Sequence, residues 1–205
     1  MRIVSDGWRY AMPPGLLATL ALPIAPVVAV ASAGIAAVIV WFFRDPNRSP
    51  RADGIVSPAD GRVSVVRSAG DRVRIGVFMN VTDVHVNRAP ASGTVTAVTH
   101  QSGAYRPAFS KDSDRNERVT IELDGPVPLK MELIAGWFAR RISPYVSPGE
   151  QVDRGDRVGH IAFGSRVDVV LPPSYDESNL LVDVGDRVRA GETIIAPPEV
   201  SHGTS

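Results

Sequence analysis

The chain has 205 residues, 44% of them hydrophobic and 21% charged, so a packed core is expected and intrinsic disorder is excluded. Its 22 basic and 22 acidic residues cancel, so we expect no nucleic-acid partner, because such a partner normally requires a basic excess. The absence of cysteine excludes disulfides, thiolate catalysis and a cysteine-ligated metal site. The length suits one domain with an appendage.

The first segment is apolar. No charged residue lies between Arg9 and Arg44. A helix needs about 20 apolar residues to cross a bilayer, so this stretch is long for one span and short for two. Pro23 and Pro26 would break it. We expect a membrane segment, either a kinked single span or a hairpin that dips into one leaflet. A cleaved signal peptide and a buried core helix are the alternatives.

The apolar segment ends in aromatic and basic residues. Trp41 to Phe43 resemble an aromatic belt, and three arginines follow it: Arg44, Arg48 and Arg51. Positive charge beside a membrane segment places the following chain on the cytoplasmic side. We therefore predict a membrane-anchoring segment over residues 1–50 and location at the cytoplasmic face of the cell membrane.

The remainder, residues 51–205, is predicted to be one mostly β domain. Short apolar runs with period two or β-branched composition alternate with Gly, Pro, Asn and Asp, which is typical of strands and turns. They begin at Val63, Val73, Val95, Val119, Leu129 and Val167.

A weak internal repeat refines this expectation. Residues 149–161 and 185–194 share the form Gly-x-x-Val-x-x-Gly followed by an apolar residue three positions on. This pattern resembles the turn-and-strand unit of barrel-sandwich hybrid folds, in which glycine permits the tight turns. We therefore expect a barrel-sandwich-hybrid-like β domain after the membrane segment.

Gly164 and Ser165 enter one of the predicted strands. A Gly-Ser pair is usually a turn. A serine after glycine can also attack the preceding carbonyl carbon where the backbone is bent, since glycine permits a strained conformation. The resulting ester can eliminate and hydrolyse to a pyruvoyl group. Such a carbonyl accepts electrons as pyridoxal phosphate does.

Six motifs in order give this chemistry a context: Phe42-Phe-Arg-Asp-Pro-Asn-Arg48, Ser57-Pro-Ala-Asp-Gly-Arg62, residues 78–90 with Asp83-Val-His-Val-Asn-Arg88, Asn116-Glu-Arg118, Ile134-Ala-Gly-Trp-Phe-Ala-Arg-Arg-Ile142 and Phe163-Gly-Ser-Arg-Val-Asp-Val-Val-Leu-Pro172. Together they resemble the short form of phosphatidylserine decarboxylase, a pyruvoyl-dependent carboxy-lyase made as a proenzyme. The resemblance runs from the apolar segment nearly to the C-terminus.

The resemblance implies the reaction and its residues. Phosphatidylserine would be converted to phosphatidylethanolamine and CO2 through a Schiff base with a pyruvoyl group made from Ser165 by autocatalytic cleavage after Gly164. Ser165, His85 and Asp60 would be catalytic. The mature protein would pair fragments 1–164 and 165–205 at the lipid bilayer, with any higher oligomer left open. No metal is expected.

One position departs from the long form of the family. That form carries a second His three residues after the first and completes an Asp-His-Ser triad for self-cleavage. This chain has Arg88 there, so either His85 serves both steps or another group activates Ser165.

Three arginines are candidates for the lipid phosphodiester, which a guanidinium can grip with two hydrogen bonds: Arg88, Arg140 and Arg141. A solvated basic face is the alternative for them. His100 and His160 lack a motif context and are expected at the surface.

Two other classes of function compete with the pyruvoyl enzyme. A membrane-anchored, non-catalytic β-module would leave the chain intact. A hybrid-fold phosphotransfer or metallopeptidase domain would use histidines, but the chain has no His-x-His pair for zinc. Neither alternative accounts for both the Gly-Ser strand and the apolar segment.

Overall fold

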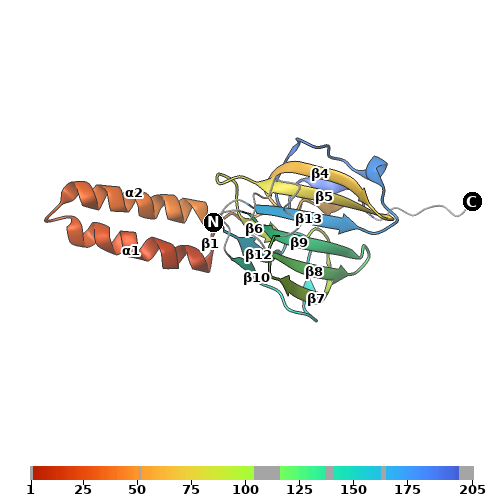
Figure 1. The fold of residues 1–205 in the computed structure, drawn as a ribbon, viewed down its shortest axis with the longest axis horizontal. Coiled ribbons are helices and arrows are strands. Elements are labelled where there is room, and N and C mark those ends of the chain that lie inside the picture. The colour runs from red at the N-terminus through yellow and green to blue at the C-terminus, as the bar shows by residue number, and fades with distance from the viewer. Residues whose placement is uncertain (1, 51, 104–115, 137–140, 163–164, 199–205) are drawn as a thin grey trace, which may run out of the picture. The chain divides into compact units, whose positions relative to one another are not determined.

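The computed structural model describes residues 2–50, 52–103, 116–136, 141–162 and 165–198. The chain divides into two compact units, Met1–Asn47 and Arg48–Ser205, which we treat separately (Figure 1).

The first unit is a helical hairpin. Helices α1 (Ser5–Ala21) and α2 (Pro26–Phe42) lie side by side, and the short strands β1 (Arg2–Ile3) and β2 (Arg44–Asp45) pair at its base (Figure 1). Pro26 is the first residue of α2, where a missing N–H costs no hydrogen bond. The predicted break at the two prolines is confirmed.

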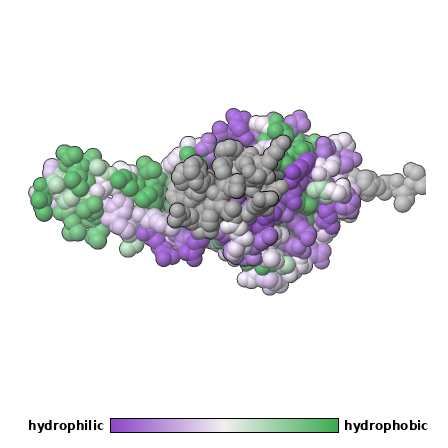
Figure 2. Space-filling view, in the orientation of Figure 1, coloured by the Kyte–Doolittle hydropathy of each residue, from purple (hydrophilic) through white to green (hydrophobic). Residues whose placement is uncertain are grey.

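Of the two forms expected for this segment, the structure has the hairpin. No helix among the described residues is long and apolar enough to cross a membrane. The alternative of a buried core helix does not hold, because most large apolar side chains of the hairpin are exposed, including Ile24 at 85% and Val27 at 82%. Figure 2 shows hydrophobic surface gathered over this unit. The sequence therefore forms two short helices with an apolar exterior.

The second unit is mostly β, as predicted. Eight strands form one antiparallel sheet in the order β11-β7-β8-β9-β13-β5-β4-β14. Their bounds are β4 (Gly61–Ala69), β5 (Arg72–Met79), β7 (Gly93–Gln101), β8 (Arg118–Asp124), β9 (Leu129–Ala135), β11 (Gln151–Val152), β13 (Ser165–Leu171) and β14 (Arg187–Val188). All six predicted apolar runs fall in these strands.

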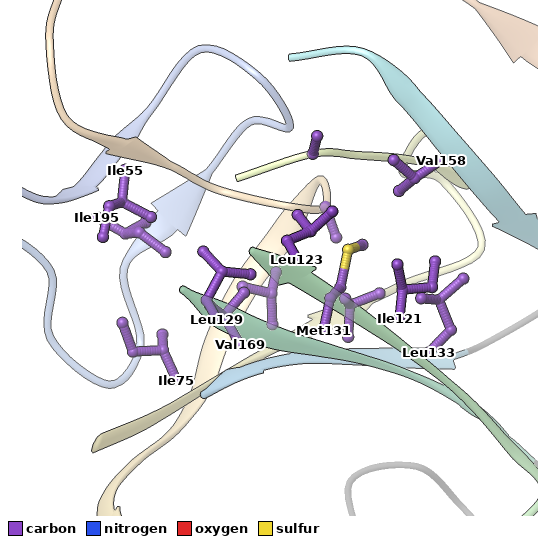
Figure 3. Close-up of a cluster of buried hydrophobic side chains, with 14 of the residues drawn as sticks. Ile55, Ile75, Ile121, Leu123, Leu129, Met131, Leu133, Val158, Val169 and Ile195 are labelled. Atoms are coloured by element: carbon purple, nitrogen blue, oxygen red, sulfur yellow. The ribbon is translucent and has the colours of Figure 1, made fainter. Parts of the chain in front are cut away.

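Smaller elements complete the β unit. One sheet contains β6 (Val86–Arg88), β10 (Ile142–Pro144) and β12 (Arg157–Ile161), another β3 (Ile55–Val56) and β15 (Ile194–Ala196), and a 3₁₀ turn covers Glu177–Asn179. The large sheet curls, and its inward side chains meet Ile55, Val158 and Ile195 from the smaller sheets (Figure 3). This contact forms the core.

The two copies of the sequence repeat make equivalent contacts. Gly149 N donates to Val95 O at 2.7 Å, and Gly185 N donates to Val63 O at 2.8 Å. The second glycines, Gly155 and Gly191, both have positive φ and carry the turns. The repeat is therefore structural, as its glycine spacing predicts.

Candidate active site

Ser165 begins β13, the strand at the centre of the large sheet. It pairs with Met79 at the end of β5 and with Ala135 at the end of β9. Alternate residues of a strand share a face, so Ser165 points to the core side with Val167 and Val169. Its side chain is 0% exposed, and its hydroxyl makes no hydrogen bond to any residue that the structure describes.

His85 is held at the same end of the sheet. It follows the turn in which Asp83 N donates to Asn80 O at 2.9 Å, directly after Met79. Its own carbonyl accepts from Ile161 N at 3.3 Å, four residues before Ser165. His85 thus lies shortly after Met79, the strand partner of Ser165, and is hydrogen-bonded to Ile161, which precedes Ser165 by four residues.

The ring of His85 has a defined tautomer. Nδ1 lies 3.0 Å from the carbonyl oxygen of Asp83, which can only accept, so Nδ1 carries the hydrogen in the neutral ring. Nε2 is then the nitrogen that can take up a proton. The imidazole is buried, which suits proton transfer in a site shielded from water.

Asn87 lies beside Met79 at the same end of the sheet, although no role was predicted for it. Its Nδ2 lies 3.5 Å from Sδ of Met79, the residue opposite Ser165, and its Oδ1 makes no hydrogen bond within the described part of the chain. The available sequence signal was the motif Asp83-Val-His-Val-Asn-Arg88, in which Asn87 stands two residues after His85.

Asp60 lies at the start of β4, two strands across from Ser165. Its carboxylate binds both Nη atoms of Arg48, with Nη2 at 2.8 Å, and accepts from Ala190 N at 2.8 Å. The sequence placed Arg48 in a motif without predicting this ion pair. Asp60 lies at the same end of the large sheet as Ser165, but its carboxylate oxygens are hydrogen-bonded to Arg48 and Ala190. Its predicted catalytic role therefore stays a prediction.

The three candidate arginines separate. Arg88 is buried, donates from Nη1 to Gly155 O at 2.8 Å and packs on Gly191. It has a packing role here, and its contact with a lipid phosphate stays a prediction. Arg141 is exposed and directly precedes Ile142, which pairs with Ile161 near Ser165. Arg140 and Gly164 lie outside the described residues.

One of the surface histidines was predicted wrongly. His160 is buried, with Nδ1 2.8 Å from Oη of Tyr145, because β12 lies between β6 and β10. His100 is exposed as expected and lies 2.9 Å from Glu117.

An ionic network covers the opposite face of β13. Asp168 accepts from Nη1 of Arg74 at 2.9 Å and from Nε of Arg166 at 2.7 Å, while Glu132 accepts from Arg74 at 2.7 Å. Burial lowers the pKa of Arg74, but hydrogen bonds and charge from Glu132 and Asp168 outweigh it and raise that pKa. Gly76 lacks the Cβ that would collide with Asp168 Oδ1.

The chain is similar in sequence to a known family of proteins. A family model described as phosphatidylserine decarboxylase matches residues 35–196. A Halobacterium salinarum protein, provisionally named an archaetidylserine decarboxylase proenzyme, is 55% identical over 92% of this chain and 95% of its own. Phosphatidylserine decarboxylase proenzymes of Thermobifida fusca and Streptomyces avermitilis are 51% and 48% identical, over 82% and 83% of this chain and 75% and 79% of theirs.

Proposed function

Because the chain belongs to the phosphatidylserine decarboxylase family, we propose that it cuts itself between Gly164 and Ser165 and then decarboxylates the serine headgroup of a phospholipid, phosphatidylserine in the first instance. One observation carries the proposal. Ser165 is the first residue of β13 and occupies the family's Gly-Ser position. Its hydroxyl is wholly buried and has no hydrogen-bond partner among the described residues. Buried polar atoms are normally satisfied, so such an atom calls for a chemical explanation.

The self-cleavage needs no oxidant. Ser165 Oγ bonds to the Gly164 carbonyl carbon as the C–N bond breaks, and the hydroxyl proton passes through a base to the nitrogen. Loss of the Ser165 Cα proton then expels the Gly164 carboxylate. Water replaces the nitrogen, which leaves as ammonia, and a pyruvoyl group remains at the start of fragment 165–205.

The pyruvoyl group supplies an electrophilic carbonyl that holds the substrate amine and accepts the electron pair left when CO2 departs. We infer that His85 Nε2 carries the protons of both steps, because Nδ1 is fixed on the Asp83 carbonyl. Asp60 would keep the start of β4 in place at this end of the sheet. Of the candidate arginines that the structure describes, Arg88 is buried and Arg141 is exposed next to β10, so we assign the lipid phosphate to Arg141.

The two fragments would remain together after the cut. Fragment 165–205 contributes β13, which pairs on both sides with β5 and β9, and also β14 and β15. The larger fragment, 1–164, holds the remaining strands. The repeat glycines at 149–155 and 185–191 fall in different fragments, which fits a barrel-sandwich-hybrid-like domain sharing one core.

The direct test is the mass of the purified protein. The wild type is expected as two fragments, the smaller one blocked at its N-terminus, while Ser165→Ala stays full length. Ser64→Ala is a matched control, because Ser64 lies in β4, two strands from β13 in the same sheet, and its hydroxyl donates to Gly76 O at 3.3 Å. An intact wild type, or cleavage of Ser165→Ala at the same bond, would overturn the proposal.

Substrate class is tested with processed protein and lipid vesicles. CO2 release is expected from serine phospholipid and not from ethanolamine phospholipid, which has no headgroup carboxylate. The relatives' names share the serine headgroup and differ in the lipid that carries it, so phosphatidylserine and archaetidylserine are assayed side by side. Absence of CO2 from both lipids would contradict the proposed activity.

We also propose that the hairpin dips into one leaflet at the cytoplasmic face of the cell membrane. Its exposed apolar side chains support this, because burial of each in hydrocarbon contributes roughly 1.5–3 kcal/mol. Ile24→Asp with Val27→Asp should weaken vesicle binding at least about tenfold. Leu181→Asp with Val184→Asp, which changes exposed apolar residues of the β unit, is the matched control. Equal binding by both double variants would contradict this anchor.

A further inference from the structure

Resting on the proposed self-cleavage, we propose that Asn87 is a positioning residue for this step, whose carboxamide oxygen accepts a hydrogen bond from the Ser165 hydroxyl and aims it at the preceding carbonyl. The inference starts from two buried polar atoms. Ser165 Oγ and Asn87 Oδ1 both lack a hydrogen bond within the described residues, and both side chains are 0% exposed.

Both residues are neighbours of Met79. Met79 stands directly opposite Ser165 in the β5–β13 pair, where facing side chains of an antiparallel pair lie on the same side of the sheet. The sulfur of the same Met79 lies 3.5 Å from Asn87 Nδ2. Asn87 and Ser165 are therefore both neighbours of Met79, one at its sulfur and the other opposite its backbone.

The chemistry of the pair is complementary. A hydroxyl donates one hydrogen bond, and a carboxamide oxygen accepts two. A thioether is a weak acceptor, so the Met79 contact leaves the amide poorly satisfied. In our proposal the Oγ–H···Oδ1 bond holds the hydroxyl oxygen in place before the attack. Because the hydroxyl has a single proton, the O–H then turns from Asn87 Oδ1 to His85 Nε2, which takes the proton as Oγ bonds to carbon.

This arrangement predicts opposite effects on stability and rate. Leucine has nearly the shape of asparagine without its polar atoms, and replacing an unsatisfied buried amide by an apolar group is neutral or stabilising. We expect Asn87→Leu to keep or raise the unfolding temperature of the uncut chain and to slow cleavage about tenfold to a hundredfold, the effect of one orienting hydrogen bond. A purely structural asparagine would lower the unfolding temperature when replaced.

The experiment follows full-length chain as it converts to fragments, with unfolding measured in a Ser165→Ala background that cannot cut. Asn87→Asp keeps an acceptor oxygen, and its cleavage should be faster than that of Asn87→Leu. It also serves if the leucine variant does not fold. Tyr175→Phe is the matched control, because it removes a made bond, Oη to Pro197 O at 3.2 Å, at the other end of β13. It should lower stability and leave the rate unchanged.

The outcomes separate this inference from the proposed function. If the wild type cuts and Ser165→Ala does not, but Asn87→Leu cuts at the wild-type rate, the role of Asn87 is overturned and the function stands. If Asn87→Leu is slow only in proportion to lost stability, or if Asn87→Asp is as slow as Asn87→Leu, Asn87 is structural. An intact wild type overturns both proposals.

Discussion

The buried polar groups on the two faces of β13 differ in their hydrogen bonding. Asp168, on the outer face, and Ser165, on the core face, are both 0% exposed. The Asp168 carboxylate accepts hydrogen bonds from two arginines, whereas the Ser165 hydroxyl accepts and donates none among the described residues. Three residues along one strand therefore separate a fully satisfied charge from an unsatisfied hydroxyl.

The two groups need different explanations, Asp168 in the stability of the sheet and Ser165 in the proposed self-cleavage. A buried charge is tolerated only when it is paired and hydrogen-bonded, so the outer network ties β5, β9 and β13 into one rigid sheet. A buried hydroxyl that is left unsatisfied costs stability, and the proposed self-cleavage would account for this cost at Ser165. In our proposal the outer face supports the strand that carries Ser165, so substitutions on the two faces should have different consequences.

The largest effect is expected at His85, on the reactive side. His85→Ala should lower turnover of processed protein by roughly 10²–10⁴-fold, because proton transfer then lacks its carrier. Cleavage and CO2 release are measured separately, since one residue serves both in our proposal. Retained turnover in fully processed His85→Ala would remove this residue from the site.

The next effect is on the rigid face. Asp168→Ala leaves Arg74 and Arg166 without their shared carboxylate, so the free energy of unfolding should fall by about 3–5 kcal/mol. Denaturant unfolding of the protein in a Ser165→Ala background gives this number without interference from cleavage. A loss under half of that would mean that the network does not brace the sheet.

Arg48 tests where Asp60 belongs in this comparison. Arg48→Ala removes two charged hydrogen bonds from Asp60. The free energy of unfolding should therefore fall by about 1.5–3 kcal/mol. If Asp60 is structural, Asp60→Asn should reproduce this loss, with turnover reduced no further than stability explains. A much larger loss of turnover in Asp60→Asn than in Arg48→Ala would place Asp60 with Ser165 instead.

The smallest effect is expected for an exposed pair on the same outer face. Lys130 and Glu122 lie 2.7 Å apart, but both side chains are partly solvated. Lys130→Ala should change the free energy of unfolding by less than about 1 kcal/mol, because surface ion pairs contribute little. This variant is the control for Asp168→Ala, and an equal loss in both would show that burial is not what distinguishes them.

Much of this molecule is determined locally by the sequence. Period-two patterns such as Val119, Ile121 and Leu123 fix which face of a strand is apolar, and the glycines of the repeat permit the positive φ of its tight turns. Pro23 and Pro26 end one helix and start another for the same local reason. The six motifs identified the family and the candidates Ser165 and His85.

Tertiary structure decided what depends on pairing between distant strands. The register sets Met79 opposite Ser165 while Asn87 contacts the sulfur of the same Met79, and the position of β12 between β6 and β10 buries His160. Arg48 and Asp60 meet beside Ala190, far along the chain, whose carbonyl oxygen accepts from Arg48 and whose N–H donates to Asp60. No local pattern encodes these contacts, because a hydrogen bond between residues far apart in sequence forms only after the sheet has fixed their separation.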